Sequence, residues 1–396
     1  MSKFKYQTNL KDYRVTHCTD RNGEISIMDL YSAEVVEYIK DIQSIYTKTN
    51  EGKNAEKDFI SHLHSIGIPS TEIENNINDL NKKKLSSIYP NSIDMLTIEE
   101  LSKLLEDAKE VFGFSVSMPP IAMVSMFSFS ARIMLPDTNR SEIIFISSGL
   151  FNFLFSIGKI MVQALEITKE KECTKVSFDK AKIRRNIQDK QLQRDFVKII
   201  TVYFYSNTCI YTGVENLTYE QAEVLGILVK TMRCFVIAHE YSHLLLGHTK
   251  RERPIDKGNI SFKIIEQNWE DEKSADQLGH MLTSIAMYNC GIEQPYSLWG
   301  GYLFIKILEI FEIFEKKIKN KQALSVTHPP AAERKIVYYD SILEESIDNM
   351  KNYVIPIFDF VFDLFQNNIE PILYNIHSKC NENMTIDELM ETIDNL

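Results

Sequence analysis

The chain has 396 residues, of which 44% are hydrophobic and 25% charged, and this ordinary globular composition excludes a disordered or fibrous protein. A net charge of −11 at pH 7 argues against a protein that coats nucleic acid, so no nucleic-acid partner is expected. Six scattered cysteines, with no Cys-x-x-Cys pair, and an N-terminus without an apolar signal segment predict a reduced, cytoplasmic protein.

Residues 1–115 are predicted to be a helical N-terminal region with polar interruptions. Residues 29–46 form one expected helix, and Thr97–Phe112 forms another, because Thr97-Ile-Glu-Glu100 has the pattern of a capping box. Pro119-Pro120 marks a boundary after it. The size and position of this region suggest a recognition or regulatory part.

Strand patterns follow the proline pair. Residues 123–135 are rich in apolar and small side chains and predict a pair of strands, with Pro136-Asp-Thr-Asn139 as the turn. Glu142–Ser147 has the strongest strand pattern of the chain, since β-branched and aromatic residues dominate it, and it leads into a helix at Ser148-Gly149-Leu150. The charged stretch Lys180–Phe196 is predicted to be helical and solvated.

Two stretches, Gly149–Ile167 and Tyr302–Phe314, are the most apolar of the chain. Both are interrupted by polar or charged residues and fall short of the about 20 apolar residues that a membrane span needs. We therefore expect buried or amphipathic helices and no integral membrane span, which leaves peripheral membrane association open.

The longest periodic element starts with the capping box Thr218-Tyr-Glu-Gln221. An apolar stripe follows it at helical spacing and continues in phase into two histidines. The members of the stripe are Leu225, Val229, Met232, Val236, His239 and His243. This pattern predicts a long, buried helix.

That helix carries the motif His239-Glu240-Tyr241-Ser242-His243, an H-E-x-x-H sequence. Histidines four residues apart lie on one helix face, so both imidazoles can reach a single metal ion. Glu240 leaves the helix at another angle and can act on a metal-bound water as general base. The alternative is a pair of hydrogen-bonded core histidines with a capping or salt-bridging glutamate. Tyr241 and Ser242, between the two histidines, are expected to pack or cap.

A catalytic zinc site needs a third protein ligand and one open position. If residues 267–288 form a helix, Glu272 and Asp276 share one of its faces, so Glu272 can ligate the metal while Asp276 accepts a hydrogen bond from a ligand histidine, such as His239. Between them, Ala275 suits close helix packing. Taken alone, this acidic run would be a solvated helix face.

Four further residues near these motifs have weaker roles or none. Glu266 and Glu270 are possible substitutes for the third ligand, and His280 is interpreted as an ordinary helix residue. His248 is given no role: it either contacts a ligand side chain from behind or lies at the surface, and the sequence favours neither position.

A third segment runs from Thr327-His328-Pro-Pro to Glu333-Arg334 and Ile336. Proline followed by an early glutamate is also ordinary helix-start chemistry. In the functional interpretation His328 lies near the metal, where it either donates to a developing oxyanion or occupies the fourth position in a resting form. Arg334 is predicted to be structural, pairing with a carboxylate near the site.

Together these motifs resemble the gluzincin peptidases of the HtpX and CAAX-prenyl-endopeptidase type. Those enzymes carry H-E-x-x-H on one helix, E-x-x-A-D on the next and a later T-H-P-P loop, which correspond here to His239–His243, Glu272–Asp276 and Thr327–Pro330. Ser130-Ala131 and Ile143–Leu150 are similar to the edge strand of that family, although the family has Asn-Ala where this chain has Ser-Ala. The resemblance covers roughly residues 120–345.

The resemblance implies an α+β, mostly helical fold: a zincin-like core with a small antiparallel sheet and two zinc-binding helices. It implies one Zn²⁺ per chain held by His239, His243 and Glu272, with Glu240 as general base. It also implies that Glu142–Ser147 holds an extended peptide by strand addition. The best-known relatives have transmembrane helices, and none is predicted here.

The sequence predicts three parts: residues 1–115, a peptidase domain over residues 116–350, and a helical C-terminal tail over residues 351–396. The leading hypothesis is a zinc endopeptidase acting on a protein or peptide substrate. The alternatives are a catalytically silent relative that binds a partner, a peptidase kept latent by His328 or by the N-terminal helices, and a soluble phage-exclusion peptidase of the Lit type, which would share the first motif.

Overall fold

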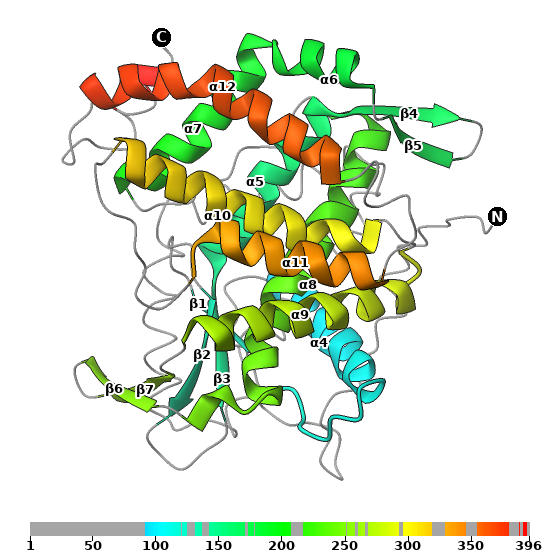
Figure 1. Cartoon of the computed structure of the whole chain (residues 1–396), viewed down its shortest axis with the longest axis vertical. Helices are drawn as coiled ribbons and strands as arrows, with labels where there is room; N and C mark the ends of the chain where they lie inside the picture. Colours follow the sequence, from blue (N-terminus) through cyan, green and yellow to red (C-terminus); the bar gives the residue numbers. More distant parts are fainter. Residues whose placement is uncertain are drawn as a thin grey trace.

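Helices make up most of the fold, and a small sheet lies beside them (Figure 1). The computed structural model describes residues 92–119, 121–124, 131–136, 142–170, 173–177, 179–206, 217–250, 252–257, 260–265, 268–292, 296–318, 329–345, 355–379, 388 and 391–393. The helix predicted over residues 29–46 lies outside this part. The mostly helical α+β composition agrees with the sequence prediction.

The helices of the described part are α4 (Ser92–Glu110), α5 (Ser148–Ala164), α6 (Lys180–Ile187), α7 (Lys190–Ser206), α8 (Tyr219–Leu245), α9 (Trp269–Asn289), α10 (Trp299–Ile318), α11 (Ala331–Glu345) and α12 (Ile355–Lys379), with short 3-10 helices η3 (His248–Lys250) and η4 (Tyr296–Leu298). The strands are β1 (Ile121–Val124), β2 (Ala131–Pro136), β3 (Ile143–Ser147), β4 (Glu166–Glu170), β5 (Cys173–Ser177), β6 (Glu252–Lys257) and β7 (Ile260–Ile265).

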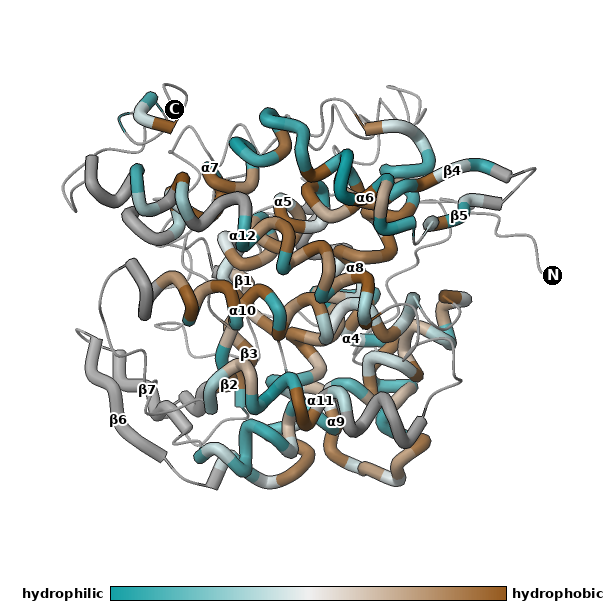
Figure 2. Tube along the Cα trace, turned by 45° about the horizontal axis from the view of Figure 1, so that its top comes forward, coloured by the Kyte–Doolittle hydropathy of each residue, from teal (hydrophilic) through white to brown (hydrophobic). Residues whose placement is uncertain are grey.

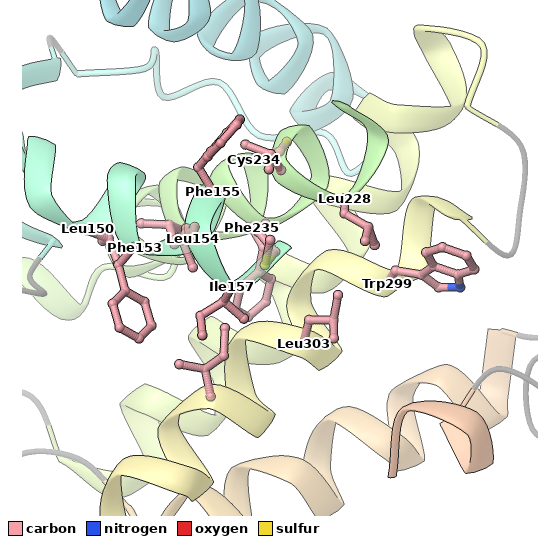
Figure 3. Packing of buried hydrophobic residues seen from close by; sticks show 14 of the residues in the cluster. Leu150, Phe153, Leu154, Phe155, Ile157, Leu228, Cys234, Phe235, Trp299 and Leu303 are labelled. Carbon is pink, nitrogen blue, oxygen red and sulfur yellow. The ribbon is translucent and has the colours of Figure 1, made fainter. Parts of the chain in front are cut away.

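Helix α8 forms the centre of the fold. It contacts α5, α9 and α10 and also touches α4, β2 and β3. Helices α5 and α8 are apolar along most of their length in Figure 2, as expected for helices buried on several sides. In Figure 3, Phe153 and Ile157 of α5, Phe235 of α8 and Leu303 of α10 gather in one cluster. Burial of these large side chains supplies the main stabilisation of this part of the fold.

The two ends of α8 follow from local sequence. The Thr218 hydroxyl accepts a hydrogen bond from the Gln221 amide at 3.2 Å, and the Gln221 side chain accepts one from the Thr218 amide at 3.0 Å. This capping box confirms the predicted start of the helix. At the other end Gly247 adopts φ +72°, a conformation that favours glycine, and it reverses the chain directly after the helix.

Two predicted helices differ from the observed ones. Helix α4 begins at Ser92, so Thr97 lies inside it and the predicted cap is wrong; nothing in the sequence Ser92–Leu96 breaks a helix. The charged stretch predicted as one solvated helix is divided into α6 and α7, because the Asp189 side chain accepts from the amides of residues 191 and 192 and starts a new helix. Its apolar side chains Ile183 and Phe196 are buried.

The main sheet has five strands in the order β1-β3-β2-β7-β6. Strand β3 pairs with β1 in parallel and with β2 in antiparallel orientation, so the predicted antiparallel sheet is in fact mixed. Residues 123–135 do contribute two strands, but β1 and β2 lie on opposite sides of β3 and do not pair with each other. Strands β4 and β5 form a separate hairpin.

Helices from the predicted N-terminal region (residues 1–115) and from the predicted C-terminal tail (residues 351–396) pack against the central helices. Helix α4 contacts α8 and α9 and contributes Leu101 and Leu105 to the buried cluster, while α12 contacts α6, α7 and α10. The predicted domain boundaries themselves stay a prediction. None of the described helices is long and apolar enough to cross a membrane.

The contact between α10 and α8 requires glycine at position 300. A Cβ added to Gly300 would overlap the backbone carbonyl of Thr231, whereas a Cβ added to Gly158 of α5 would meet the flexible end of Leu225 at 2.9 Å. We expect Gly300→Ala to lower the free energy of unfolding by about 3 kcal/mol, because backbone cannot move aside. The control Gly158→Ala should stay within about 1 kcal/mol of wild type. Urea unfolding of both variants measures this; equal losses would contradict it.

Candidate metal centre

Helices α8 and α9 bring three potential metal ligands together in a buried position. The Nε2 atoms of His239 and His243 lie 3.2 Å apart. Glu272 places Oε2 3.5 Å from Nε2 of His239 and its other oxygen, Oε1, 3.5 Å from Nε2 of His243. His243 and Glu272 have no solvent exposure, and His239 is 8% exposed. Among the described residues this is the group of histidine, cysteine and acidic side chains whose geometry can hold a metal ion.

The separations within this group fit a tetrahedral ion. Zinc holds nitrogen and oxygen ligands at about 2.0–2.2 Å, so two tetrahedral ligands lie about 3.3 Å from each other. The distance of 3.2 Å between the two Nε2 atoms agrees with this value, and each of the two Glu272 oxygens lies 3.5 Å from one of these nitrogens. Two imidazoles and one carboxylate are also the donor set of one common type of catalytic zinc site, in which the fourth position stays open.

A buried ion pair fixes the orientation of His239. The Asp276 carboxylate lies 2.9 Å from Nδ1 of His239, and the Arg334 guanidinium donates to the same carboxylate at 2.7 and 2.6 Å. Because the Asp276 carboxylate favours a proton on Nδ1, Nε2 is the nitrogen of His239 that faces His243 and Glu272, and it presents a lone pair to them when the ring is neutral. The structure therefore places Asp276 and Arg334 directly behind a candidate ligand, as the sequence suggested.

The first turns of α9 position Glu272 and Asp276. Asn268 starts the helix in a reciprocal capping box with Asp271, whose amide donates to the Asn268 side chain at 2.9 Å. Farther along, Gly279 packs against α8, where an added Cβ would lie 3.0 Å from the His239 amide nitrogen. A glycine at this point lets the two helices approach closely enough for Glu272 to reach both histidines.

The electrostatics of the group favour positive charge beside the carboxylates of Glu272 and Asp276. Burial opposes a charge on His239, but hydrogen bonds to Asp276 and Glu272 outweigh it and raise the pKa of His239 to about 10. Burial and the neighbouring His239 lower the pKa of His243. Burial also opposes the charge of Asp276, yet the Arg334 guanidinium holds the pKa of this carboxyl below its usual value.

Glu240 is buried and contacts the sheet. Its carboxylate accepts a hydrogen bond from the backbone amide of Ile133 in β2 at 2.8 Å. Strand β2 pairs with β7 only from Met134 onward, so in the described part of the chain no strand pairs with its first residues on the side opposite β3. Among the described residues, the edge of β2 that faces Glu240 thus has no strand partner at Ala131–Ile133, and the Ile133 amide there is bonded to Glu240.

This arrangement corrects the predicted peptide-binding strand. Strand β3, within the predicted Glu142–Ser147 segment, has β1 on one side and β2 on the other, and the side chains of Ile143–Ser147 are all buried. A strand with both edges paired cannot accept another strand. The open edge beside Glu240 is the short stretch Ala131–Ile133 of β2, since Met134–Pro136 of this strand pair with β7.

The other predicted residues occupy varied positions. Glu270 is exposed and pairs with Lys273, so it is not brought to the ligands. His280 is buried in α9 outside the ligand group, as expected for a helix residue. The Tyr241 hydroxyl donates to the Val116 carbonyl at 2.5 Å, and the Ser242 hydroxyl donates to Ala238 within the helix.

Two candidates, Glu266 and His328, lie outside the described residues, and their roles stay predictions. His248, which the sequence left unassigned, is adjacent to the site: its Nδ1 lies 3.0 Å from Nδ1 of His243. The glycine that ends α8 was the available signal, because a reversal of the chain there returns the next residue to the last turn of the helix.

Comparison with known proteins gives no relative: no protein-family model, no curated protein and no solved structure matches the chain.

Arg334 is expected to be essential for stability because it pairs with a buried carboxylate. Replacing it by Met removes both guanidinium hydrogen bonds and leaves the buried Asp276 with only His239 beside it, which should cost about 3–5 kcal/mol of unfolding free energy. Its neighbour Lys335 makes one partly exposed ion pair with Glu309 at 3.4 Å, so the control Lys335→Met should cost less than about 1 kcal/mol. Urea unfolding of metal-free protein measures both, and similar losses would contradict the assignment.

His280 should make the protein sensitive to acid. Burial lowers its pKa to about 3 in the folded state, from 6.5, so the unfolded chain takes up a proton there that the folded chain does not. Stability is therefore lost as the pH falls below 6.5, by about 1.4 kcal/mol per pH unit. Between pH 6.5 and 5, unfolding free energies should fall about 2 kcal/mol more for wild type than for His280→Gln. Identical pH slopes would contradict this.

Proposed function

We propose that this protein is a zinc-dependent endopeptidase of the gluzincin type, acting on a protein or peptide substrate. The observation that carries the proposal is the convergence of His239, His243 and Glu272 at separations that suit a tetrahedral ion. A zinc ion at this site would supply Lewis-acid activation of water and of a substrate carbonyl. One zinc per chain is expected.

The residues around the site have separate tasks in this proposal. Glu240 takes a proton from the attacking water and returns it to the leaving amine, as a buried carboxylate beside the ligands can do. Asp276 and Arg334 hold the imidazole of His239 in one tautomer and orientation. The buried charges support a cationic occupant, because Glu240, Glu272 and Asp276 against Arg334 leave two net negative charges when both imidazoles are neutral.

The open edge of β2 supports a peptide as substrate. Backbone groups of Ala131–Ile133 that point away from β3 are available to an extended chain, and the Ile133 amide already reaches Glu240. Strand addition at this edge would orient a peptide by its main chain, independently of its side chains, next to the general base. Glu240 would then have to exchange its contact with the Ile133 amide for one with water.

Two substitutions separate metal binding from chemistry. Glu240→Gln should keep about one zinc per chain yet lower peptide cleavage at least about 100-fold, because the general base is lost and the ligands remain. Glu272→Ala should lose most of the zinc, while Glu270→Ala, an exposed carboxylate in the same turn, should keep both metal and activity. Elemental mass spectrometry measures the metal, and a proteome-derived peptide library measures cleavage.

The outcomes distinguish the alternatives. Cleavage that survives Glu240→Gln would contradict the role of Glu240. A wild type that carries no zinc after purification in zinc-supplemented buffer would overturn the metal site. A wild type that carries zinc but cleaves no peptide in the library would favour a silent or latent binding protein.

A further inference from the structure

A third histidine lies directly behind the second ligand. Helix α8 ends at Leu245, Gly247 reverses the chain at φ +72°, and η3 begins with His248. In this position the Nδ1 atoms of His248 and His243 are 3.0 Å apart. The centroids of the two rings are 5.2 Å apart, and the ring planes make an angle of 63°. The contact is on the side of His243 that faces away from His239 and Glu272, since those two approach Nε2.

A hydrogen bond between two Nδ1 atoms requires one proton between them, and the surroundings decide which ring carries it. Nε2 of His248 lies 3.8 Å from a carboxylate oxygen of Asp271. A negative carboxylate favours a proton on that Nε2, and a neutral imidazole carries only one proton. Nδ1 of His248 is then the acceptor, so the shared proton belongs to Nδ1 of His243.

The consequence reaches the metal site. With its proton on Nδ1, His243 has a lone pair on Nε2, directed at the group formed with His239 and Glu272. His239 is held in the same tautomer by Asp276, at 2.9 Å. Each candidate histidine ligand thus has its own acceptor behind it: a carboxylate for His239 and a second imidazole for His243.

We propose that His248 is a positioning residue that holds His243 as a metal ligand, with Asp271 fixing the tautomer of His248. This inference rests on the proposed metal site and adds a residue to which the sequence motifs assigned no role. Side chains that orient a ligand from behind typically contribute 10–100-fold to metal affinity. His248 contributes this through a hydrogen bond and does not touch the metal.

The test is the zinc affinity of the full-length protein, measured by competition with a chromophoric chelator. His248→Leu should weaken zinc binding about 10–100-fold, because His243 loses its acceptor. His248→Asn should stay within about threefold of wild type, since its amide oxygen can accept near the position of Nδ1. The control is Thr249→Val, a buried residue of the same 3-10 helix, which should leave the affinity unchanged.

A second readout separates positioning from general damage. In the cobalt(II)-substituted protein, His248→Leu should shift the visible absorption of the bound ion, whereas Thr249→Val and His248→Asn should not, because only the first changes the ligand geometry. Circular dichroism of the metal-free variants checks folding. If His248→Leu does not fold, His248→Gln replaces it, as its longer side chain places the amide away from the position of Nδ1.

The possible failures are distinct. A wild type without zinc overturns the metal site and this inference with it. A wild type that binds zinc, with His248→Leu binding equally well, overturns only the inference. A loss in His248→Asn as large as in His248→Leu, or an equal loss in Thr249→Val, also overturns it, because local packing would then explain the effect.

Discussion

The close contact between α8 and α9 is the constraint on which the candidate site depends. Gly279 lets α9 approach the backbone of α8 at His239, where an added Cβ would meet the amide nitrogen at 3.0 Å. At this separation Glu272, two turns earlier in α9, reaches between His239 and His243 at 3.5 Å from each. A side chain at position 279 would push the helices apart and move the carboxylate away from both imidazoles.

The same contact encloses charge in an apolar surrounding, and the fold compensates for it in two ways. Arg334 binds Asp276 through two hydrogen bonds, so this carboxylate stays ionised although it has no solvent exposure. Glu272 has two imidazoles beside it, and a buried carboxylate in such a place requires a proton or a metal ion for charge balance. The site can therefore hold a proton, as the raised pKa of His239 indicates, or a metal ion in its place.

The features that the sequence predicts well are those set by local rules. The capping box at Thr218 and the 3.6-residue period predict α8, and a spacing of four residues alone places His239 with His243 on one face. The helix that presents Glu272 and Asp276 follows from the same rules. Their contact with α8 is not local, and the sequence suggested it only through motif order; His248 was left unassigned because the turn after α8 had to be known first.

Strand order could not be predicted, for a physical reason that also bears on substrate binding. A strong strand pattern reflects burial, and all five side chains of Ile143–Ser147 are buried, which is what a central strand requires. A peptide needs the opposite, an edge with unpaired backbone groups. Among the described residues, Ala131–Ile133 of β2 have no strand partner on the side opposite β3, and this stretch carries the exposed Arg132 beside the small Ala131. Strand β2 lies in the middle of the sheet, and no sequence pattern marks the local gap in its pairing, so the position of this gap next to Glu240 had to come from the fold.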